Sequence, residues 1–369
     1  MNLLGKASVA VYRTLVLGGI LLLCLNLSSG VHTATAAPSG KYFDHVVTIV
    51  MENRDLPSVL AHGPYQASLA KNYSLATGYS GVDHPSEPNY CVMIGATTTG
   101  CADDGTCCAN TSNLVDRFES SGVTWKAFAE DADNSGTCNF SPPRGGDHFG
   151  FLLFNDNNGS PARCSNMLTT ASPQDPEFIA SLSDSANAPN FVWLTPNDHD
   201  NSHDTNIRTG DNYLAGIVPS ILASPVFQNT RAALFIVYDE GNDVACATGG
   251  GQDCIYASWS GPGVTTGLNS TTSYDHYSYI HTIEDNWGLQ PLNQKDAAAP
   301  VMSEFFTGGG TGTNLGTNQW LLIGAVVGGV GAVMLVSWKL LSRTSSSSRR
   351  HPRRTSHRKK PTVPPVPSP

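Results

Sequence analysis

Basic residues are scarce over most of this sequence. Residues 38–319 contain ten Lys and Arg residues together with all 30 Asp and Glu residues of the chain, so their formal charge is −20. This surplus of negative charge argues against a nucleic-acid partner, because phosphate backbones are bound by basic surfaces. It also offers no general attraction for other phosphorylated ligands, for which a bound metal ion would have to supply positive charge locally.

Acidic residues are absent from both ends of the chain, and the N-terminal end has the pattern of a secretory signal peptide. Lys6 and Arg13 precede an apolar run over residues 14–27, and small residues follow at positions 34–37. This order of basic, apolar and small residues predicts a signal peptide over residues 1–37, cleaved near Ala37. An uncleaved anchor helix is the alternative, which the shortness of the apolar run disfavours.

The C-terminal end contains a second apolar segment. No charge interrupts residues 320–338, which as a helix would extend about 28 Å, close to the roughly 30 Å hydrocarbon thickness of a bilayer. A tryptophan flanks each end, and nine Lys and Arg residues follow, as in a cytoplasmic tail. The preceding domain would then be extracellular and tethered to the cell membrane by a single pass. We predict a Gly/Thr spacer over residues 307–319, a transmembrane helix over 320–341 and a basic, disordered cytoplasmic tail over 342–369.

Eight cysteines lie outside the predicted signal peptide, and an even number in an exported domain indicates disulfides. Cys246 with Cys254, and Cys138 with Cys164, are candidate local pairs. A zinc cluster within residues 101–108 is the alternative, which its adjacent cysteines disfavour. Five glycosylation sequons fit an exported surface, at Asn72, Asn110, Asn139, Asn158 and Asn269.

The region between the two apolar segments shows no internal repeat, and its roughly 280 residues are enough for one large domain with a substantial core. Strands alternating with helices predict an α/β domain over residues 38–306, with a mostly parallel sheet covered by helices on both faces. Apolar runs predict strands over residues 44–51, 190–194 and 232–238, and weaker ones over 123–128 and 254–259. Helical patterns cover residues 113–120, 176–182, 212–222 and 278–287. Long loops are expected over residues 101–110, 134–159 and 245–251.

Polar residues follow each of the three central strands. Glu52-Asn53-Arg54 follows the first, a stretch from Pro196 to Asp204 with two histidines follows the second, and Asp239-Glu240 follows the third. Sites in open α/β sheets form at the carboxyl ends of strands. One such ending is more often a helix cap or a solvated turn, but three together predict a metal- or phosphate-binding site.

A rigid turn, His84-Pro85-Ser86-Glu87-Pro88-Asn89, precedes a short helical pattern. Ser86 would lie near a helix N-terminus, where free N–H groups favour an anion. No Gly-x-Ser-x-Gly motif surrounds it, so a metal ion is a better activator of this hydroxyl than a serine-esterase arrangement. Taken alone, Ser86 would be interpreted only as a cap. His276 begins another helical pattern and suits metal or phosphate binding, whereas His281 would face elsewhere.

Together these residues resemble the phosphoesterase family of secreted acid phosphatases and phospholipases C, which belongs to the alkaline-phosphatase superfamily. The turn at Ser86 is most similar to that of secreted acid phosphatases, including those that act on phosphoinositides. The resemblance covers roughly residues 44–289. It rests on six motifs in order: Glu52-Asn53-Arg54, His84 to Tyr90, Pro196-Asn197 with His203-Asp204, Gly210 to Leu214, Tyr238-Asp239-Glu240, and His276 with Ser278 and Glu284.

The resemblance implies an alkaline-phosphatase-like fold and a catalytic serine. Ser86 would attack phosphorus and form a phosphoseryl intermediate that water hydrolyses, with His203 and His276 as catalytic proton carriers or phosphate donors. These histidines, with Asp204, could instead hold a second metal ion. His199 is a weaker candidate, and Asp200 would be a ligand or a support for His203. A divalent metal ion would be held by Glu52, Asn53, Ser86, Asp239 and Glu240, and the substrate would be contacted by Asn53, His84, Asn89 and Asp204.

The leading hypothesis is hydrolysis of phosphate monoesters, with lipid and inositol phosphates among the candidate substrates. One alternative is a phospholipase C type phosphodiesterase, which would use the same site. Another is a non-catalytic surface protein that binds its ligand through the metal site. The sequence predicts neither the identity of the metal nor the oligomeric state.

Overall fold

The structure is a computed structural model that describes residues 38–102, 110–133, 138, 140, 148–249 and 251–307. All of them belong to the first of two compact units, Met1–Gly309 and Gly310–Pro369. The predicted signal peptide, transmembrane helix and tail, and almost all of the spacer, lie outside the described residues. Within the described residues, no helix combines the length and apolar character needed to cross a membrane.

An eight-stranded sheet forms the centre of the domain, in the order β5-β4-β6-β1-β7-β8-β2-β9. The five strands from β5 to β7 run parallel to one another, whereas β8 is antiparallel to both of its neighbours. The predicted α/β class with a mostly parallel sheet is therefore confirmed. The strands of this sheet are β1 (His45–Met51), β2 (Ser74–Ala76), β4 (Trp125–Glu130), β5 (Met167–Thr170), β6 (Phe191–Thr195), β7 (Ala232–Tyr238), β8 (Ala257–Ser260) and β9 (Leu268–Ser270).

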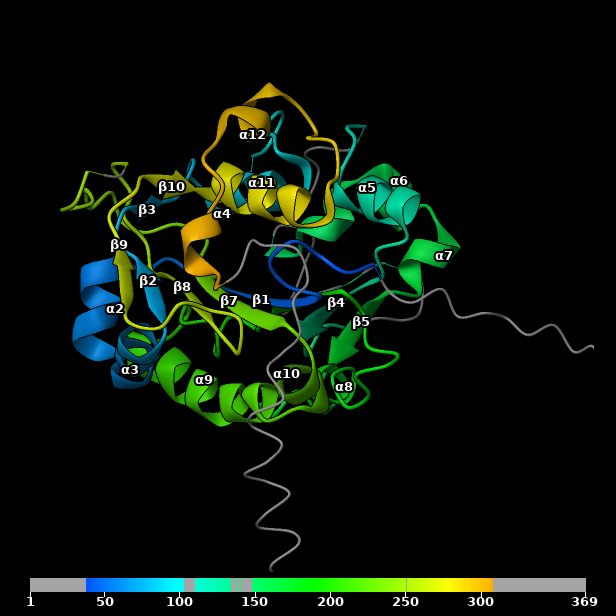
Figure 1. Cartoon of the computed structure of the whole chain (residues 1–369). Coiled ribbons are helices and arrows are strands. Elements are labelled where there is room, and N and C mark those ends of the chain that lie inside the picture. Colours follow the sequence, from blue (N-terminus) through cyan, green and yellow to red (C-terminus); the bar gives the residue numbers. More distant parts are fainter. Residues whose placement is uncertain are drawn as a thin grey trace, which may run out of the picture. The chain divides into compact units, whose positions relative to one another are not determined.

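Helices cover both faces of this sheet, as predicted (Figure 1). One face carries α4 (Ser86–Gly95), α5 (Leu114–Ser121), α11 (His276–Trp287) and α12 (Gln294–Ala298). The other carries α3 (Pro64–Asn72), α8 (Pro176–Ala180), α9 (Ile207–Leu222) and α10 (Pro225–Asn229). The remaining short helices are α2 (Leu56–His62), α6 (Asn155–Asn158), α7 (Pro161–Cys164), η2 (Gly150–Leu153) and η3 (Ser303–Phe305).

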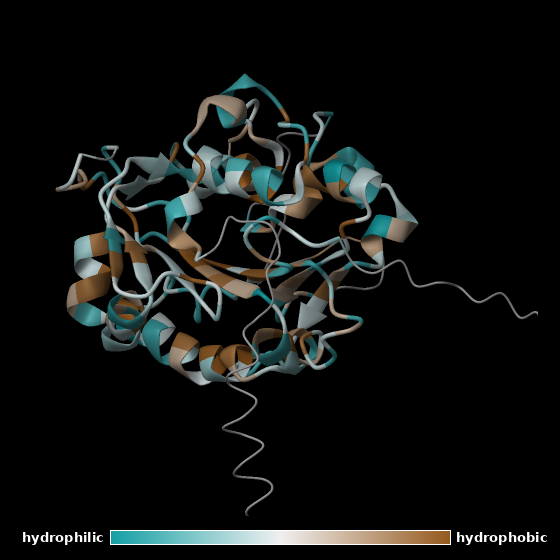
Figure 2. Ribbon diagram, viewed as in Figure 1, coloured by the Kyte–Doolittle hydropathy of each residue, from teal (hydrophilic) through white to brown (hydrophobic). Residues whose placement is uncertain are grey.

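The central strands are mostly apolar because they are covered on both faces. Every residue of β1, β6 and β7 is buried, and Figure 2 shows hydrophobic residues concentrated in these strands. Each large apolar side chain buried there stabilises the fold by about 1.5–3 kcal/mol. The core therefore fixes the strand ends that carry the polar residues.

The predicted elements are present with shifted boundaries. The strands predicted over 44–51, 190–194 and 232–238 are β1, β6 and β7, and the weaker ones are β4 and β8. The helix predicted over 212–222 begins earlier, at Ile207, because the Asn206 side chain accepts a hydrogen bond from the Thr209 N–H and caps it. The helix predicted over 278–287 begins at His276, where Asp275 and Ser278 form a capping box.

Two small features bring distant segments together. The strands β3 (Tyr79–Ser80) and β10 (Tyr274–Asp275) form a separate parallel pair beside α11. Both candidate disulfides are formed: Cys138–Cys164, with a Cα–Cα distance of 5.4 Å, and Cys246–Cys254, with 4.7 Å. Cys91 and Cys101 are disulfide-bonded as well, which removes Cys101 as a thiolate ligand for the alternative zinc cluster.

Candidate active site

The carboxyl ends of β1 and β7 bring two carboxylates together. These strands are parallel neighbours with Met51 opposite Tyr238, so the next residues, Glu52 and Asp239, are adjacent. Both side chains are 0% exposed. The backbone N–H of Asn53 donates to Oδ1 of Asp239 over 3.0 Å, and Asn53 has a left-handed φ of 55° that turns the chain away from the strand.

Ser86 lies directly over this carboxylate pair. It is the first residue of α4, after Pro85, and its side chain is buried. Its Oγ donates to Oε2 of Glu52 over 3.1 Å and lies 3.4 Å from Oδ1 of Asn53. Tyr90, four residues along the same helix face, also donates its hydroxyl to Glu52. The hydroxyl predicted to be the nucleophile is therefore held by the residues predicted to bind a metal ion.

The carboxyl groups of Glu52 and Asp239 are buried side by side. The pKa of Asp239 is well above its usual range because the carboxyl is fully buried and lies beside Glu52. Among the described residues, its Oδ2 atom has no hydrogen-bond partner. A proton or a cation must compensate such a pair. Carboxylate, amide and hydroxyl oxygens are the ligands that hard divalent ions prefer, so Glu52, Asn53, Ser86 and Asp239 fit a divalent metal ion.

Glu240 is directed toward His84. Its Oε2 atom lies 3.0 Å from Nδ1 of His84 and accepts from Nδ2 of Asn89 over 3.3 Å. Burial, and then the charge of Asp239, raise the pKa of Glu240 to about 8. Burial alone would lower the pKa of His84, but the carboxylates around its ring shift it upward overall. In this arrangement Glu240 is paired with His84, which itself was predicted to contact substrate.

Two histidines lie on the other side of Glu52. Nε2 of His148 is 3.8 Å from Oε1 of Glu52, and the rings of His148 and His203 lie 5.6 Å apart. One ligand atom from each of these three residues lies within 4.8 Å of the others, a spacing that could hold a metal ion or a phosphate. Nδ1 of His203 lies 2.8 Å from Oδ1 of Asp204. Burial alone would lower the pKa of His203, but this hydrogen bond and the charge of Glu52 shift it upward overall.

His276 is placed behind the site. Its side chain is fully buried, Nδ1 lies 3.1 Å from the Tyr79 hydroxyl, and Nε2 lies 2.6 Å from the backbone carbonyl of Asp239. Because a carbonyl only accepts, Nε2 carries a proton and Nδ1 accepts from Tyr79. Burial lowers the pKa of His276, in agreement with a neutral ring. Its contacts support the backbone of Asp239.

Asn89 supports the turn before Ser86. Its Oδ1 atom accepts from the N–H groups of Val82 and Asp83 over 2.9 and 3.3 Å, and its Nδ2 donates to the carbonyl of Asp83 over 2.7 Å. These bonds use the side chain that was predicted to bind phosphate. Asn89 therefore fixes the position of Ser86.

The loop after β6 is attached to the end of β1. The N–H of Glu52 donates to the Asn201 carbonyl over 3.1 Å. Arg54 donates from Nη2 to the carbonyls of Ser202 and Thr205, over 2.6 and 2.7 Å. These bonds hold His203 near Glu52. His199 and Asp204 are far more exposed, with side chains 70% and 69% accessible.

The profile of the phosphoesterase family matches residues 59–290, more than half of the chain. The chain belongs to the phosphoesterase family. The resemblance stated from the sequence motifs is thereby confirmed.

Several characterised phosphoesterases are similar to this one. A phosphate-repressible acid phosphatase of Penicillium chrysogenum is 28% identical over 291 residues, which are 73% of this chain and 66% of the relative. An acid phosphatase of Aspergillus fumigatus is 26% identical over 71% of this chain and 59% of its own length. The phosphatidylinositol-3-phosphatase of Mycobacterium tuberculosis is 28% identical over 81% of this chain and 96% of its own length. The chain thus spans about two thirds or less of these two acid phosphatases. The comparisons indicate a hydrolase of phosphoric ester bonds.

A solved structure of a protein in the alkaline phosphatase superfamily from Vibrio parahaemolyticus also matches this phosphoesterase. The two share 10% identity and a TM-score of 0.47, over 70% of this chain and 73% of that one.

Three contributors to the site are not among the residues predicted from the sequence. His148 lies in a stretch predicted to be a long loop, and its only local signal is the apolar run that follows it. Tyr90 belongs to the Ser86 motif, and its spacing of four residues from Ser86 would have placed both on one helix face. Asp253, whose Oδ2 lies 3.6 Å from Nε2 of His84, stands in a Gly-rich loop directly before the strand predicted over 254–259.

Proposed function

We propose that this phosphoesterase hydrolyses phosphate monoesters, with Ser86 as the nucleophile and a divalent metal ion beside it. The observation that carries the proposal is the position of the Ser86 hydroxyl, 3.1 Å from Glu52 and beside the buried carboxylate of Asp239, whose Oδ2 has no hydrogen-bond partner among the residues that the structure describes. Glu52, Asn53, Ser86 and Asp239 would hold the ion. When bound, the ion lowers the pKa of the serine hydroxyl and neutralises charge on the phosphoryl group.

In the first step, Oγ of Ser86 attacks phosphorus and its proton passes to Oε2 of Glu52, which already accepts that hydrogen bond. The bond between Oγ and phosphorus forms, and the bond from phosphorus to the leaving oxygen breaks. His203 is suited to protonate the leaving oxygen, because Asp204 and Glu52 favour its charged form.

In the second step, water attacks the phosphoseryl group. The bond from phosphorus to Oγ breaks, and the proton returns from Glu52 to Ser86. His203 accepts a proton from the attacking water and is thereby ready for the next cycle. His148, whose ring lies beside that of His203, would donate to a phosphoryl oxygen.

Lipid phosphates are the substrates that this proposal favours. One relative is a phosphatidylinositol-3-phosphatase, and its match takes in nearly its whole length. The predicted signal peptide and C-terminal membrane helix would hold the catalytic domain outside the cell and close to a bilayer surface. These segments lie outside the described residues, so the tether and the extracellular location remain predictions from the sequence.

The test compares the full chain with Ser86→Ala and with Ser120→Ala, an exposed serine at the end of α5. The assays use p-nitrophenyl phosphate, its bis-ester, phosphatidylinositol 3-phosphate and phosphatidylcholine, across pH, with and without chelator. We expect monoester hydrolysis that chelator and Ser86→Ala abolish and Ser120→Ala preserves. Preferred hydrolysis of the bis-ester or phosphatidylcholine would instead assign a phospholipase C type activity. Metal binding without hydrolysis of any ester would assign a binding protein.

A further inference from the structure

Asp253 supports the segment that follows Asp239 and Glu240. It is 8% exposed, in the loop before β8. Its Oδ2 accepts from the N–H of Gly241 over 2.8 Å, and its Oδ1 accepts from the N–H of Asp243 over 3.1 Å. Both carboxylate oxygens therefore hold the backbone directly after the strand end that carries the candidate metal ligands.

The same residue also reaches the turn that carries Ser86. The N–H of Gly81 donates to the backbone carbonyl of Asp253 over 2.9 Å, and Oδ2 of Asp253 lies 3.6 Å from Nε2 of His84. Asp253 is thus bonded on one side to the nucleophile turn and on the other to the loop after β7. Asp253 therefore connects the segment that leads to Ser86 with the segment that follows Glu240.

The packing around Asp253 requires glycine on both sides. A Cβ atom at Gly81 would lie 2.5 Å from Oδ2 of Asp253, and one at Gly241 would lie 2.7 Å from Oδ1. Both distances are well inside van der Waals contact. The two glycines let their backbone segments approach Asp253 closely, so that the Gly241 N–H donates to its carboxylate and the Gly81 N–H to its backbone carbonyl.

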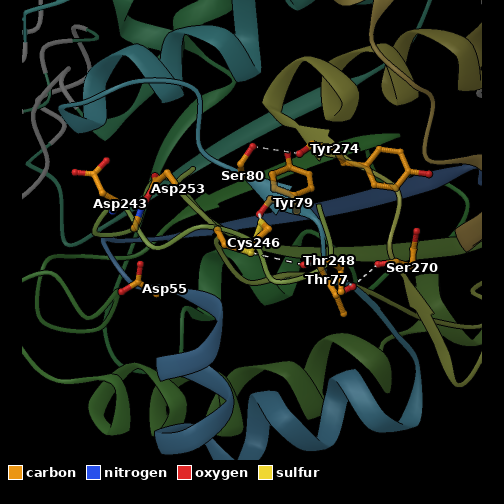
Figure 3. The surroundings of a disulfide bond; sticks show 12 residues. Asp55, Thr77, Tyr79, Ser80, Asp243, Cys246, Thr248, Asp253, Ser270 and Tyr274 are labelled. Carbon is orange, nitrogen blue, oxygen red and sulfur yellow. Dashed lines mark hydrogen bonds between the residues drawn. A yellow bond between two sulfur atoms is a disulfide. The ribbon is translucent and has the colours of Figure 1, made fainter. Parts of the chain in front are cut away.

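The Cys246–Cys254 disulfide fixes the loop that presents Asp253. Cys254 follows Asp253 directly, and its N–H donates to the Val244 carbonyl over 2.7 Å. The N–H of Cys246 donates to the carbonyl of Gly251 over 3.2 Å. Figure 3 shows Asp243 and Asp253 together beside this disulfide. The cross-link closes a loop of few residues and so limits the positions available to its neighbour Asp253.

We infer that Asp253 is a positioning residue that holds the Ser86 turn against the metal-binding loop, and that the Cys246–Cys254 disulfide keeps it in place. This inference rests on the proposed function. Residues that support metal ligands in this way typically change metal affinity or activity by about 10–100-fold when they are removed.

The first experiment uses the metal-free full chain and measures Mn²⁺ binding by calorimetry. We expect Asp253→Ala to weaken Mn²⁺ binding by at least about tenfold and to lower kcat, with a much smaller change in KM. Asp253→Asn keeps one carbonyl oxygen as acceptor and should lie between Ala and wild type. The control is Asp184→Ala, a change at an exposed loop aspartate outside the candidate site. Asp184 also accepts a backbone hydrogen bond, from the Ala186 N–H over 3.0 Å.

The second experiment compares the two disulfides. Cys246→Ser with Cys254→Ser should reproduce part of the Asp253→Ala loss in Mn²⁺ affinity, whereas Cys138→Ser with Cys164→Ser should not. Near-ultraviolet circular dichroism and the melting temperature check that each variant is folded. If Asp253→Ala does not fold, the Mn²⁺ affinity and kcat of Asp253→Asn are compared with those of wild type instead.

The inference is overturned if the folded Asp253→Ala variant has the Mn²⁺ affinity and kcat of wild type, whether or not its melting temperature is lower. The disulfide part is overturned if both cysteine pairs behave alike. These results differ from failure of the proposed function, in which wild-type protein itself neither binds Mn²⁺ nor hydrolyses a phosphate ester.

Discussion

Two of the pairs of buried carboxyl groups among the described residues are alike in burial and different in surroundings. Glu52 and Asp239 lie at the ends of β1 and β7, whereas Glu284 on α11 lies beside Asp296 on α12. All four side chains are 0% exposed. Burial and the neighbouring carboxyl raise the pKa of Asp239 well above its usual range, and the same two causes raise the pKa of Glu284 to about 9.

The groups that surround each pair distinguish a candidate active site from a structural contact. Around Glu52 and Asp239 lie a serine hydroxyl, a tyrosine hydroxyl and a histidine ring. Around Glu284 and Asp296 lie backbone N–H groups: that of Leu292 donates to Glu284 over 3.0 Å and to Asp296 over 2.6 Å. The second pair thus fixes the chain entering α12.

The comparison teaches that a perturbed pKa is an insufficient sign of function. Buried acid pairs of both kinds need a compensating positive charge or proton. A pair surrounded by further metal-type ligands and a nucleophile can use a metal ion for this purpose. A pair surrounded by backbone amides can use a shared proton and still serve only the fold.

The largest expected effect separates the two pairs directly. Asp239→Asn should lower kcat/KM by more than about 100-fold and abolish tight Mn²⁺ binding, because it would remove a proposed metal ligand. Glu284→Gln should change kcat/KM by less than about twofold, since surroundings without a nucleophile or histidine have no chemical role. Steady-state kinetics and calorimetry measure both. Equal losses in the two variants would remove the distinction drawn here.

A second effect concerns the histidine near Glu52, which the other pair lacks. His203→Gln should lower kcat by about 10²-fold or more, because the leaving group loses its proton donor. The wild-type rate should fall as pH rises above the raised pKa of His203, and this limb should be absent in the variant. His62→Gln, a change at an exposed histidine of α2, is the control. An unchanged pH profile in His203→Gln would assign the proton donor elsewhere.

A third effect is on stability and concerns metal removal. The raised pKa of Asp239 means that, without metal, its stabilising neutral form is fully present below the unfolded pKa and is lost as pH rises. Chelator should therefore lower the melting temperature more at pH 8 than at pH 5. A metal present at 100 times its Kd would contribute about 2.7 kcal/mol. Differential scanning fluorimetry measures this, and a chelator effect independent of pH would contradict it.

The last effect is expected at the structural pair, in stability and not in activity. With a pKa of about 9 in the folded state against a reference value of 4.5, protonated Glu284 stabilises the fold fully below pH 4.5. This contribution declines as pH rises toward 9, by at most about 1.4 kcal/mol per pH unit. Glu284→Gln does not titrate, so its unfolding free energy should vary less between pH 5 and 8 than that of wild type. Urea unfolding at both pH values tests this, and parallel pH dependence would contradict it.

The central part of the fold could be predicted because burial on both faces gives long apolar runs, as in β1 and β7. The strands β5 and β9 escaped prediction because they are short edge strands, with the sequences Met-Leu-Thr-Thr and Leu-Asn-Ser and partly exposed side chains. Such strands form because they pair with a neighbouring strand, and the local sequence pattern carries no information about that neighbour.

The candidate site was predictable where polar residues directly follow buried strands, as at Glu52 and Asp239. Parallel strands fix which of their ends meet, so these residues converge whatever their separation in sequence. The individual contacts were not predictable in this way. His148 comes from a loop, and Glu240 is paired with His84 because of how the turn folds back toward β7.

Three arginines of this domain make structural contacts, and residues 38–319 carry a formal charge of −20. Arg54 donates to backbone carbonyls, Arg231 binds Asp44, and Arg163 binds Asp116, Glu119 and Asp156. An anionic substrate approaching the domain would therefore be repelled until it reaches the site itself. Added salt shortens the range of this repulsion, so substrate capture should become faster as ionic strength rises. Enzymes that attract their substrates by charge show the opposite trend. An enzyme that repels its substrate would encounter it chiefly because both are held at the same membrane surface.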